Sequence, residues 1–226
     1  MIIWLASYPK SGNTLLRSML SAYLFTQDGK FNFDVLNNIK QFPDFGVFKN
    51  LGVDISNELE VVKSYIKVQK DINLRDGNSI RFLKTHSSLQ NINGFKFTDL
   101  DNTLGAIYIV RDPRNIVKSY SNHSQVSIDE ALKMLQEQRV IGGEEDRTNK
   151  SVMHVGSWMT HYMSWRELKK VNRYLLIKYE DLVSDPKNSF IKILNFVYKL
   201  NKQNVKLDKV KLENVLKTTT FEFLKK

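Results

Sequence analysis

A short run of small, polar and basic residues near the start of the chain has the composition of an anion-binding loop. Lys10, Ser11, Gly12, Asn13 and Thr14 follow one another directly. A glycine turn that opens a helix leaves backbone N–H groups free, and the helix dipole adds attraction for negative charge. Lys10 supplies a full positive charge and its neighbours supply further donors. Phosphate binding is therefore favoured over a plain turn with a solvated lysine.

The spacing of this run differs from that of the loop that binds nucleoside triphosphates. That loop reads G-x-x-x-x-G-K-[ST], with the lysine after the second glycine. Here Lys10 precedes Gly12 by two residues, so this run is not the triphosphate motif. That motif does not occur in any other part of the chain either. ATP hydrolysis is therefore disfavoured.

A lysine and a histidine end the apolar segment 80–86, which is typical of a strand. Ligands of open α/β sheets bind beyond the carboxyl ends of the strands, where Lys84 and His86 are expected. Imidazole has a pKa close to neutrality and can take a proton from a hydroxyl or an amine. A lone histidine at a strand end is usually structural, but beside an anion-binding loop His86 becomes a candidate general base.

An arginine follows the third strongly apolar segment, 106–110. Asp112 can cap a new helix and Pro113 fits its first turn, so Arg111 is expected between a strand end and a helix start. A planar, permanently charged guanidinium suits bidentate binding of a phosphate. Arg111 is therefore a candidate ligand for a phosphate.

The elements that must position these side chains follow from the apolar pattern. Residues 2–6 predict a buried strand, and apolar residues at helical spacing predict a helix over 15–24. Further strands are predicted at 80–86 and 106–110, a final strand within 174–182 runs into a turn, and helices are predicted over 54–70 and 152–168. This alternation predicts one α/β domain with a mostly parallel sheet of about four or five strands flanked by helices.

Composition limits the remaining possibilities. The 226 residues carry a net charge of +10 and include no cysteine, which excludes disulfides, thiolate metal sites and a cysteine nucleophile. We find no convincing cluster of metal ligands and no targeting or membrane-spanning segment, and we expect a cytoplasmic protein. The charge alone also permits a basic nucleic-acid-binding domain, but no motif of a known nucleic-acid module appears, so we expect no nucleic acid as partner.

Four segments occur in an order that is typical of one enzyme family. They are 8–14 (Y-P-K-S-G-N-T), 84–86 (K-T-H), 111–119 (R-D-P-R-N, then Ser119) and 178–182 (K-Y-E-D-L). They resemble the motifs Y-P-K-S-G-T-T-W, K-T-H, R-[DN]-P-[RK]-[DN] with a later serine, and [RK]-Y-E-D-L of sulfotransferases that use 3′-phosphoadenosine 5′-phosphosulfate (PAPS). A segment at 218–224 also resembles the family's T-S-F-x-x-M.

The resemblance implies a single P-loop-like sulfotransferase domain over 1–226 that moves a sulfuryl group from PAPS to a hydroxyl or an amine. It implies that His86 is the base and that Lys10 and Lys84 stabilise the transition state. The loop 10–14 would bind the 5′-phosphosulfate. The 3′-phosphate and the adenine would be bound by Arg111, Ser119, Tyr179 and Phe221. No metal is implied.

Two departures from the family pattern stand out. Leu15 replaces the tryptophan that stacks on adenine, and no basic R-K-G loop follows the last helix before Lys226, so we expect the C-terminal cofactor loop to be absent. These departures keep open the alternative of a catalytically silent module that binds adenosine 3′,5′-bisphosphate (PAP). The segment 27–79 is a variable insert that we expect to cover the acceptor site. A small-molecule or carbohydrate acceptor is expected, but neither its identity nor the oligomeric state follows from the sequence.

Overall fold

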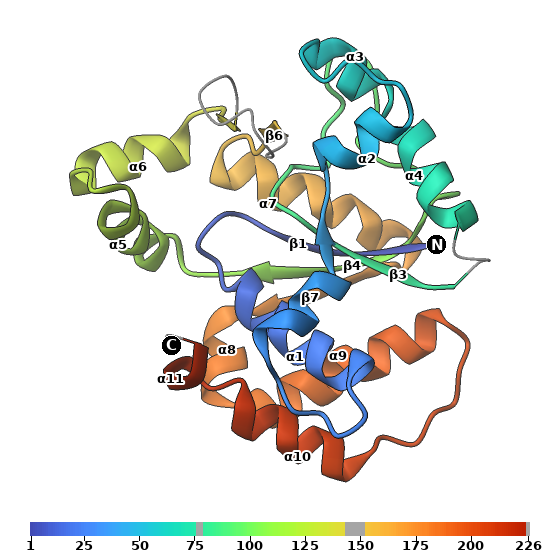
Figure 1. Cartoon of the computed structure of the whole chain (residues 1–226). Helices are drawn as coiled ribbons and strands as arrows, with labels where there is room; N and C mark the ends of the chain where they lie inside the picture. The colour runs from blue at the N-terminus through green and yellow to red at the C-terminus, as the bar shows by residue number, and fades with distance from the viewer. Residues whose placement is uncertain (76–78, 143–151, 225–226) are drawn as a thin grey trace.

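The computed structural model describes residues 1–75, 79–142 and 152–224. Its centre is a five-stranded sheet in the order β2-β3-β1-β4-β7, in which every neighbouring pair is parallel (Figure 1). The strands are β1 (Ile2–Ser7), β2 (Lys40–Gln41), β3 (Arg81–Thr85), β4 (Thr103–Val110) and β7 (Tyr174–Lys178). The predicted α/β class and the parallel sheet are confirmed. Within the described residues, no helix is both long and apolar enough to cross a membrane.

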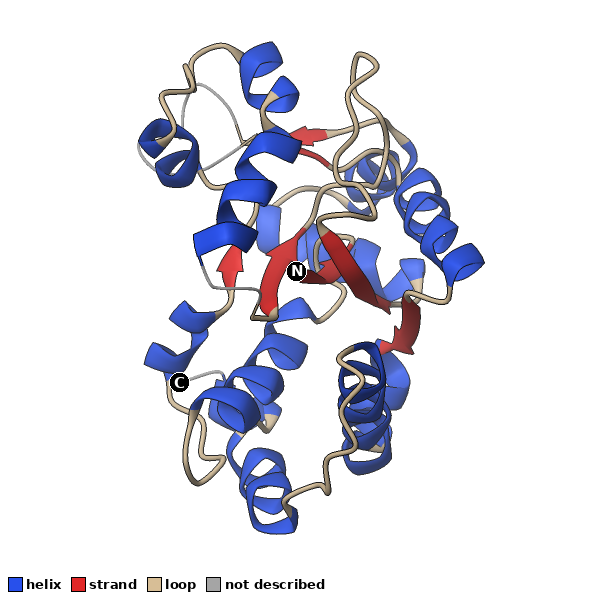
Figure 2. Cartoon of the chain, turned by 90° about the vertical axis from the view of Figure 1, so that its right-hand side faces the viewer, coloured by secondary structure: helices blue, strands red, loops and turns tan. Residues whose placement is uncertain are grey.

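The side chains of β1 alternate between two apolar cores, as expected for a central strand covered on both faces. Ile3 and Leu5 belong to the core under one helical layer, and Trp4 and Ala6 belong to the core under the other. Figure 2 shows helices on both sides of the strands. The first layer contains α1 (Asn13–Phe25), α8 (Tyr179–Ser184), α9 (Pro186–Leu200) and α10 (Lys209–Thr218), and the second contains α2 (Phe45–Asn50), α3 (Glu58–Lys63), α4 (Tyr65–Arg75) and α7 (Trp158–Arg166).

The remaining elements extend the fold beyond the sheet. The helices α5 (Pro113–Ser124) and α6 (Ile128–Gln136) pack with the short antiparallel pair β5 (Val140–Ile141) and β6 (Met153–His154) around a third apolar cluster. Two short 3-10 helices, η1 (Phe33–Asn38) and η3 (Glu167–Val171), and α11 (Phe221–Leu224) complete the described elements.

Two helix predictions were wrong in their extent. The helix predicted over 54–70 is two helices, because α3 ends at Lys63 with Ser64 as its C-cap and α4 begins at Tyr65. The helix predicted over 152–168 starts only at Trp158, after β6. Gly156 has φ +72°, a left-handed conformation that a helix cannot contain, and this residue separates β6 from α7.

The carboxyl ends of four strands meet at one edge of the sheet. Ala6 pairs with Thr85, Ser7 pairs with Ile109, and Val110 pairs with Lys178. The segments that leave these strands therefore start side by side: the loop from Tyr8, then His86, Arg111 and Tyr179. This register brings together the four sequence motifs, although they are far apart in the chain.

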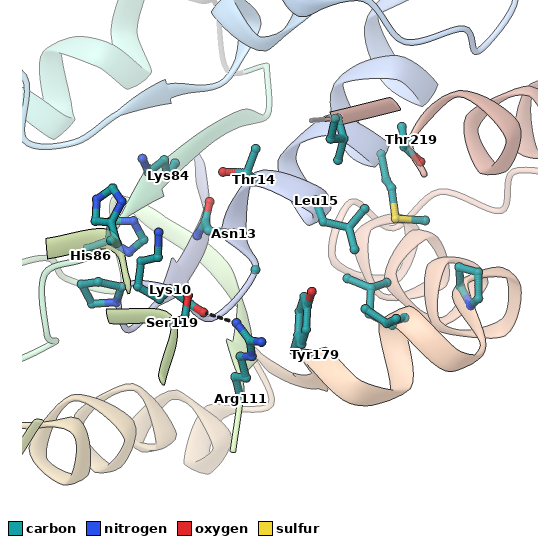
Figure 3. Close-up of a pocket in the computed structure, with 18 of the residues that line it drawn as sticks. Lys10, Asn13, Thr14, Leu15, Lys84, His86, Arg111, Ser119, Tyr179 and Thr219 are labelled. Carbon is teal, nitrogen blue, oxygen red and sulfur yellow. Dashed lines mark hydrogen bonds between the residues drawn. The ribbon is translucent and has the colours of Figure 1, made fainter. Parts of the chain in front are cut away.

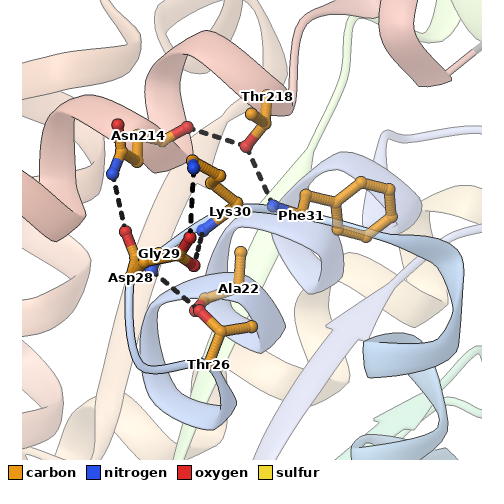
Figure 4. A network of polar contacts seen from close by, with 8 residues as sticks. All are labelled: Ala22, Thr26, Asp28, Gly29, Lys30, Phe31, Asn214 and Thr218. Carbon is orange, nitrogen blue, oxygen red and sulfur yellow. Dashed lines mark hydrogen bonds and ion pairs between the residues drawn. The ribbon is translucent and has the colours of Figure 1, made fainter.

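A polar clasp ties the end of α1 to α10 (Figure 4). The amide of Asn214 donates to the Asp28 carbonyl over 2.8 Å, and the Phe31 N–H donates to the Thr218 hydroxyl over 2.9 Å. Gly29 has φ +78°, and a Cβ at this position would lie 2.4 Å from the Lys211 carbonyl oxygen, so only glycine allows the approach. The clasp fixes the position of α10, whose Leu216 lines a cleft at the carboxyl edge of the sheet.

Candidate active site

A cleft of about 1000 Å³ opens at the carboxyl edge of the sheet. Nine residues that the sequence predicted for the site line it: Lys10, Gly12, Asn13, Thr14, Lys84, His86, Arg111, Ser119 and Tyr179. In Figure 3 Lys10, Lys84 and His86 gather at one end, whereas Leu15, Tyr179 and Thr219 lie at the other. Ser11 is buried within the loop, and the side chain of Phe221 lies outside the described residues.

The loop between β1 and α1 turns through two residues with left-handed backbone. Lys10 has φ +66°, and Gly12, the N-cap of α1, has φ +96°. The Ser11 side chain is 1% exposed, and its hydroxyl has no hydrogen-bond partner in the described part of the chain. A buried hydroxyl without a partner costs free energy unless a ligand satisfies it. The loop therefore has the donors and the shape of an anion-binding turn at a helix start.

Gly12 is the position in this loop where a side chain is excluded most strictly. A Cβ there would lie 2.3 Å from Cδ2 of Tyr179 and the backbone would stay left-handed, at a cost of about 1 to 3 kcal/mol. We expect Gly12→Ala to displace the Tyr179 ring and to weaken PAP binding at least about tenfold. Isothermal titration calorimetry checks this. Gly52→Ala is the matched control for left-handed strain, because Gly52 has φ +72° and open space around it; equal losses of PAP affinity in both variants would contradict the expectation.

Arg111 joins the end of β4 to the loop. Its Nη1 donates to the Lys10 carbonyl over 3.0 Å, and its guanidinium lies 4.5 Å from the centroid of the Tyr179 ring. Its Nε is buried and has no hydrogen-bond partner among the described residues. The guanidinium is thus held in place by the loop and the ring, and it retains donors for an anion.

His86 is oriented by the last residue of β1. Its Nδ1 lies 2.7 Å from the Ser7 carbonyl oxygen and 3.2 Å from the Ser7 hydroxyl. A carbonyl can only accept, so Nδ1 carries the proton and Nε2 is the basic nitrogen. Burial, reinforced by the charge of Lys84, lowers the pKa of His86 to about 4, and the ring is neutral at pH 7.

A second histidine holds the backbone of the first. His161 is fully buried; its Nε2 donates to the His86 carbonyl over 3.1 Å and its Nδ1 accepts from the Tyr108 hydroxyl over 2.8 Å. Burial lowers the pKa of His161 to about 3, which keeps it neutral. Both ring nitrogens are occupied within the protein, and His161 fixes the chain at the exit of β3.

The cleft is strongly positive. Its described lining includes Lys10, Lys84 and Arg111 but no aspartate or glutamate. Burial, together with the charge of Arg17, lowers the pKa of Lys84 to about 8, and burial and the charge of Arg111 lower the pKa of Lys10. Such shifts arise where cations lack nearby counter-charges, and a bound anion would reverse them. Within the described residues no cluster of three or more potential metal ligands occurs.

A family model described as the sulfotransferase domain matches residues 2–226. The chain belongs to the sulfotransferase domain family. Among curated relatives, it is 27% identical over 230 residues to Sulfotransferase 1A1 from Bos taurus, covering 98% of this chain and 65% of the relative. It is 24% identical over 220 residues to 3-alpha-hydroxysteroid sulfotransferase from Cavia porcellus, covering 97% of this chain and 64% of the relative.

The solved structures support the same fold. The crystal structure of mouse sulfotransferase SULT7A1 complexed with PAP matches with a TM-score of 0.61 and 20% identity, covering 99% of this chain and 65% of the other. The chain spans about 65% of the length of these relatives. At this identity the comparison establishes the sulfotransferase fold.

Several residues that line the cleft of this sulfotransferase domain were not predicted from the sequence. Tyr120 and His123 come from α5, and Ile141 and Met153 come from the β5–β6 pair. Two-residue strands show no periodicity, so nothing in the sequence marked the last two. The described lining includes no residue of the insert 27–79, whose buried side chains mostly pack in the core beneath α2, α3 and α4; its role as a cover stays a prediction.

Proposed function

We propose that this domain transfers a sulfuryl group from PAPS to a hydroxyl or an amine of a small-molecule or carbohydrate acceptor. One observation carries the proposal. The neutral His86, whose basic nitrogen is Nε2, lines the same cleft as Lys10, Lys84 and Arg111. A base and a set of cations in one cleft are what this transfer needs and what a plain nucleotide-binding module would not need.

The unpaired donors of the cleft fit an anionic nucleotide. The Ser11 hydroxyl and the Arg111 Nε are buried without partners in the described structure, and the lining carries no acid. In this proposal the loop 10–14 holds the 5′-phosphosulfate, and Arg111 with Ser119 holds the 3′-phosphate. Tyr179, on which Arg111 stacks, and Leu15 border the space for the adenine.

PAPS supplies the sulfuryl group, and adenosine 3′,5′-bisphosphate is the other product. His86 Nε2 takes the proton of the attacking hydroxyl or amine as the new bond to sulfur forms. Lys10 faces the negative charge that grows on the bridging oxygen as the bond from sulfur to that oxygen breaks, and Lys84 is the second cation. Both lysines then stabilise the transition state more than the ground state.

Part of the cleft lining is apolar and is the proposed place of the acceptor. Tyr120, Ile141 and Met153, which belong to one apolar cluster, line the cleft, and His123 adds a polar atom. Such a lining favours acceptors with an aromatic or alicyclic body that carries one reactive hydroxyl. The relative named 3-alpha-hydroxysteroid sulfotransferase carries that kind of acceptor in its name. A cytoplasmic location remains part of the same proposal.

Calorimetry with PAP and transfer of radioactive sulfur from labelled PAPS test the function together. In a panel of phenols, hydroxysteroids, sugars and amines, at least one compound should accept sulfur at a rate above the background rate measured without an acceptor. Tight PAP binding with no transfer to any class would instead support the silent module. Failure to bind PAP, together with DNA or RNA binding that falls steeply with salt, would support the hypothesis of a basic nucleic-acid-binding domain.

The pH profile of kcat/KM for PAPS should have an alkaline limb set by Lys84. The partly buried Lys84, with a pKa of about 8, loses its proton above that pH and its charge with it, so the rate should fall there. His86, with a pKa of about 4, stays an unprotonated base over the whole range above about pH 5. Lys84→Arg, which keeps its charge, should move the alkaline limb upward by more than one pH unit. A limb that stays near pH 8 in this variant would remove Lys84 from that role.

A further inference from the structure

The side chain of Asn13 is committed to the protein rather than to a ligand. Its amide nitrogen donates to the Leu5 carbonyl over 2.9 Å and to the Ser7 hydroxyl over 3.1 Å. A primary amide has two N–H donors, and these two bonds use both. The remaining atom, Oδ1, is buried without a partner in the described residues and can only accept. An acceptor oxygen repels a phosphate, so only the backbone N–H of Asn13 remains for an anion.

The two bonds of Asn13 close the loop on itself. Asn13 is the first residue of α1, and both acceptors belong to β1. The amide therefore straps the start of the helix to the end of the strand across the turn that contains Lys10 and Gly12. Asn13 is 4% exposed, and in Figure 3 it lies between Thr14 and Lys10, with Lys84 and His86 beyond.

Ser7 connects Asn13 to His86, the proposed base, by hydrogen bonds. The Ser7 carbonyl accepts from His86 Nδ1, and the Ser7 hydroxyl lies 3.2 Å from the same nitrogen. If the Ser7 side chain rotated, its hydroxyl could donate to an Nδ1 without a proton. The imidazole proton would then lie on Nε2, and the ring would present an N–H to the substrate instead of a basic nitrogen. The Asn13 amide holds the hydroxyl in its place and so protects the useful tautomer.

We infer that Asn13 is a positioning residue that holds Ser7, and through Ser7 the basic tautomer of His86, and that its side chain does not bind the nucleotide phosphates. This inference rests on the proposed role of His86. It differs from the role that the sequence predicted, in which the Asn13 side chain is a phosphate donor. The two roles predict opposite effects of the same substitution on nucleotide affinity and on turnover.

Asn13→Ala removes both donors and separates these roles. We expect kcat to fall about tenfold, the scale of a small misplacement of a catalytic group, and the Kd for PAP to stay within about threefold. Nitrogen-15 NMR of the imidazoles reports the tautomer directly, and the chain has only four histidines, so the His86 signals can be assigned with His86→Gln. In the wild type they should report a protonated Nδ1, and in Asn13→Ala a mixture of tautomers.

Thr14→Ala is the matched control. Thr14 is the next residue of α1, lines the same cleft, and its exposed hydroxyl makes no hydrogen bond within the described residues. Because the Thr14 hydroxyl is proposed to donate to a phosphate, its removal should raise the Kd for PAP about tenfold, the scale of one charge-assisted hydrogen bond. The His86 signals should stay unchanged. If Asn13→Ala does not fold, Asn13→Thr replaces it, because one hydroxyl satisfies only one of the two acceptors; kcat should then fall less, with PAP affinity retained.

Two results would overturn the inference. One is a rise in the Kd for PAP in the Asn13 variant as large as that in Thr14→Ala, and the other is an unchanged tautomer of His86. Both readouts use PAP and the protein alone. They still decide the role of Asn13 if the wild type transfers sulfur to no acceptor, which would overturn the proposed function instead.

Discussion

Replacing His86 with alanine should lower kcat at least ~100-fold, the scale of a lost general base, and leave the Kd for PAP within about twofold. The imidazole is neutral at pH 7 because burial lowers its pKa to about 4, and its Nδ1 is bonded to the Ser7 carbonyl. In the proposed mechanism Nε2 is therefore the atom that takes the proton. Binding should survive because the proposed phosphate contacts come from the loop and from Arg111. Single-turnover transfer from labelled PAPS measures the rate.

Added imidazole gives the control for this prediction. The alanine variant leaves a ring-sized space beside the cleft, and free imidazole should restore part of the rate in proportion to its concentration. His86→Gln fills the space without a base and should not respond. Full activity in His86→Ala would remove His86 from the mechanism. A lost rate accompanied by lost PAP binding would make its role structural.

The sequence predicted the parts of the site in which a basic side chain stands shortly after the end of a strand. Lys10, His86 and Arg111 each follow an apolar segment, and parallel strands bring their carboxyl ends to one edge whatever the details of packing. The central strand β1 was equally clear, because its apolar run is uninterrupted. These features depend on local pattern and topology, which a single sequence records.

The sequence did not predict the parts of the site that depend on particular hydrogen-bond partners and side-chain directions. Asn13 has the composition of a phosphate donor, yet its amide points back to Leu5 and Ser7. The contact of His161 with the His86 carbonyl joins residues 75 positions apart. Ile141 and Met153 reach the cleft through strands of two residues, too short to show alternation. Side-chain direction and long-range contacts are properties of the folded core, not of any one segment.

Arg111 should dominate the affinity for the nucleotide. Two charge-assisted hydrogen bonds of about 1.5 kcal/mol each correspond to about a 100-fold rise in the Kd for PAP in Arg111→Ala. Arg111→Lys keeps the charge but loses the planar fork and the stacking on Tyr179, so it should still lose about tenfold. The Lys10 carbonyl also loses its donor, and kcat should therefore fall as well. Calorimetry with PAP at two salt concentrations measures the affinity and its charge dependence.

Arg114 provides the matched control for charge. It lies three residues further on, its side chain is 88% exposed, and it pairs with Asp112 instead of reaching the cleft. Arg114→Ala removes the same charge from the same helix start, so a purely long-range effect of charge would weaken PAP binding in both variants alike. We expect a change below about twofold in Arg114→Ala, because an exposed charge is screened by solvent and salt. The difference between the two variants then measures direct contact of Arg111 with the nucleotide; equal losses would mean that Arg111 acts only through the field of the basic cleft.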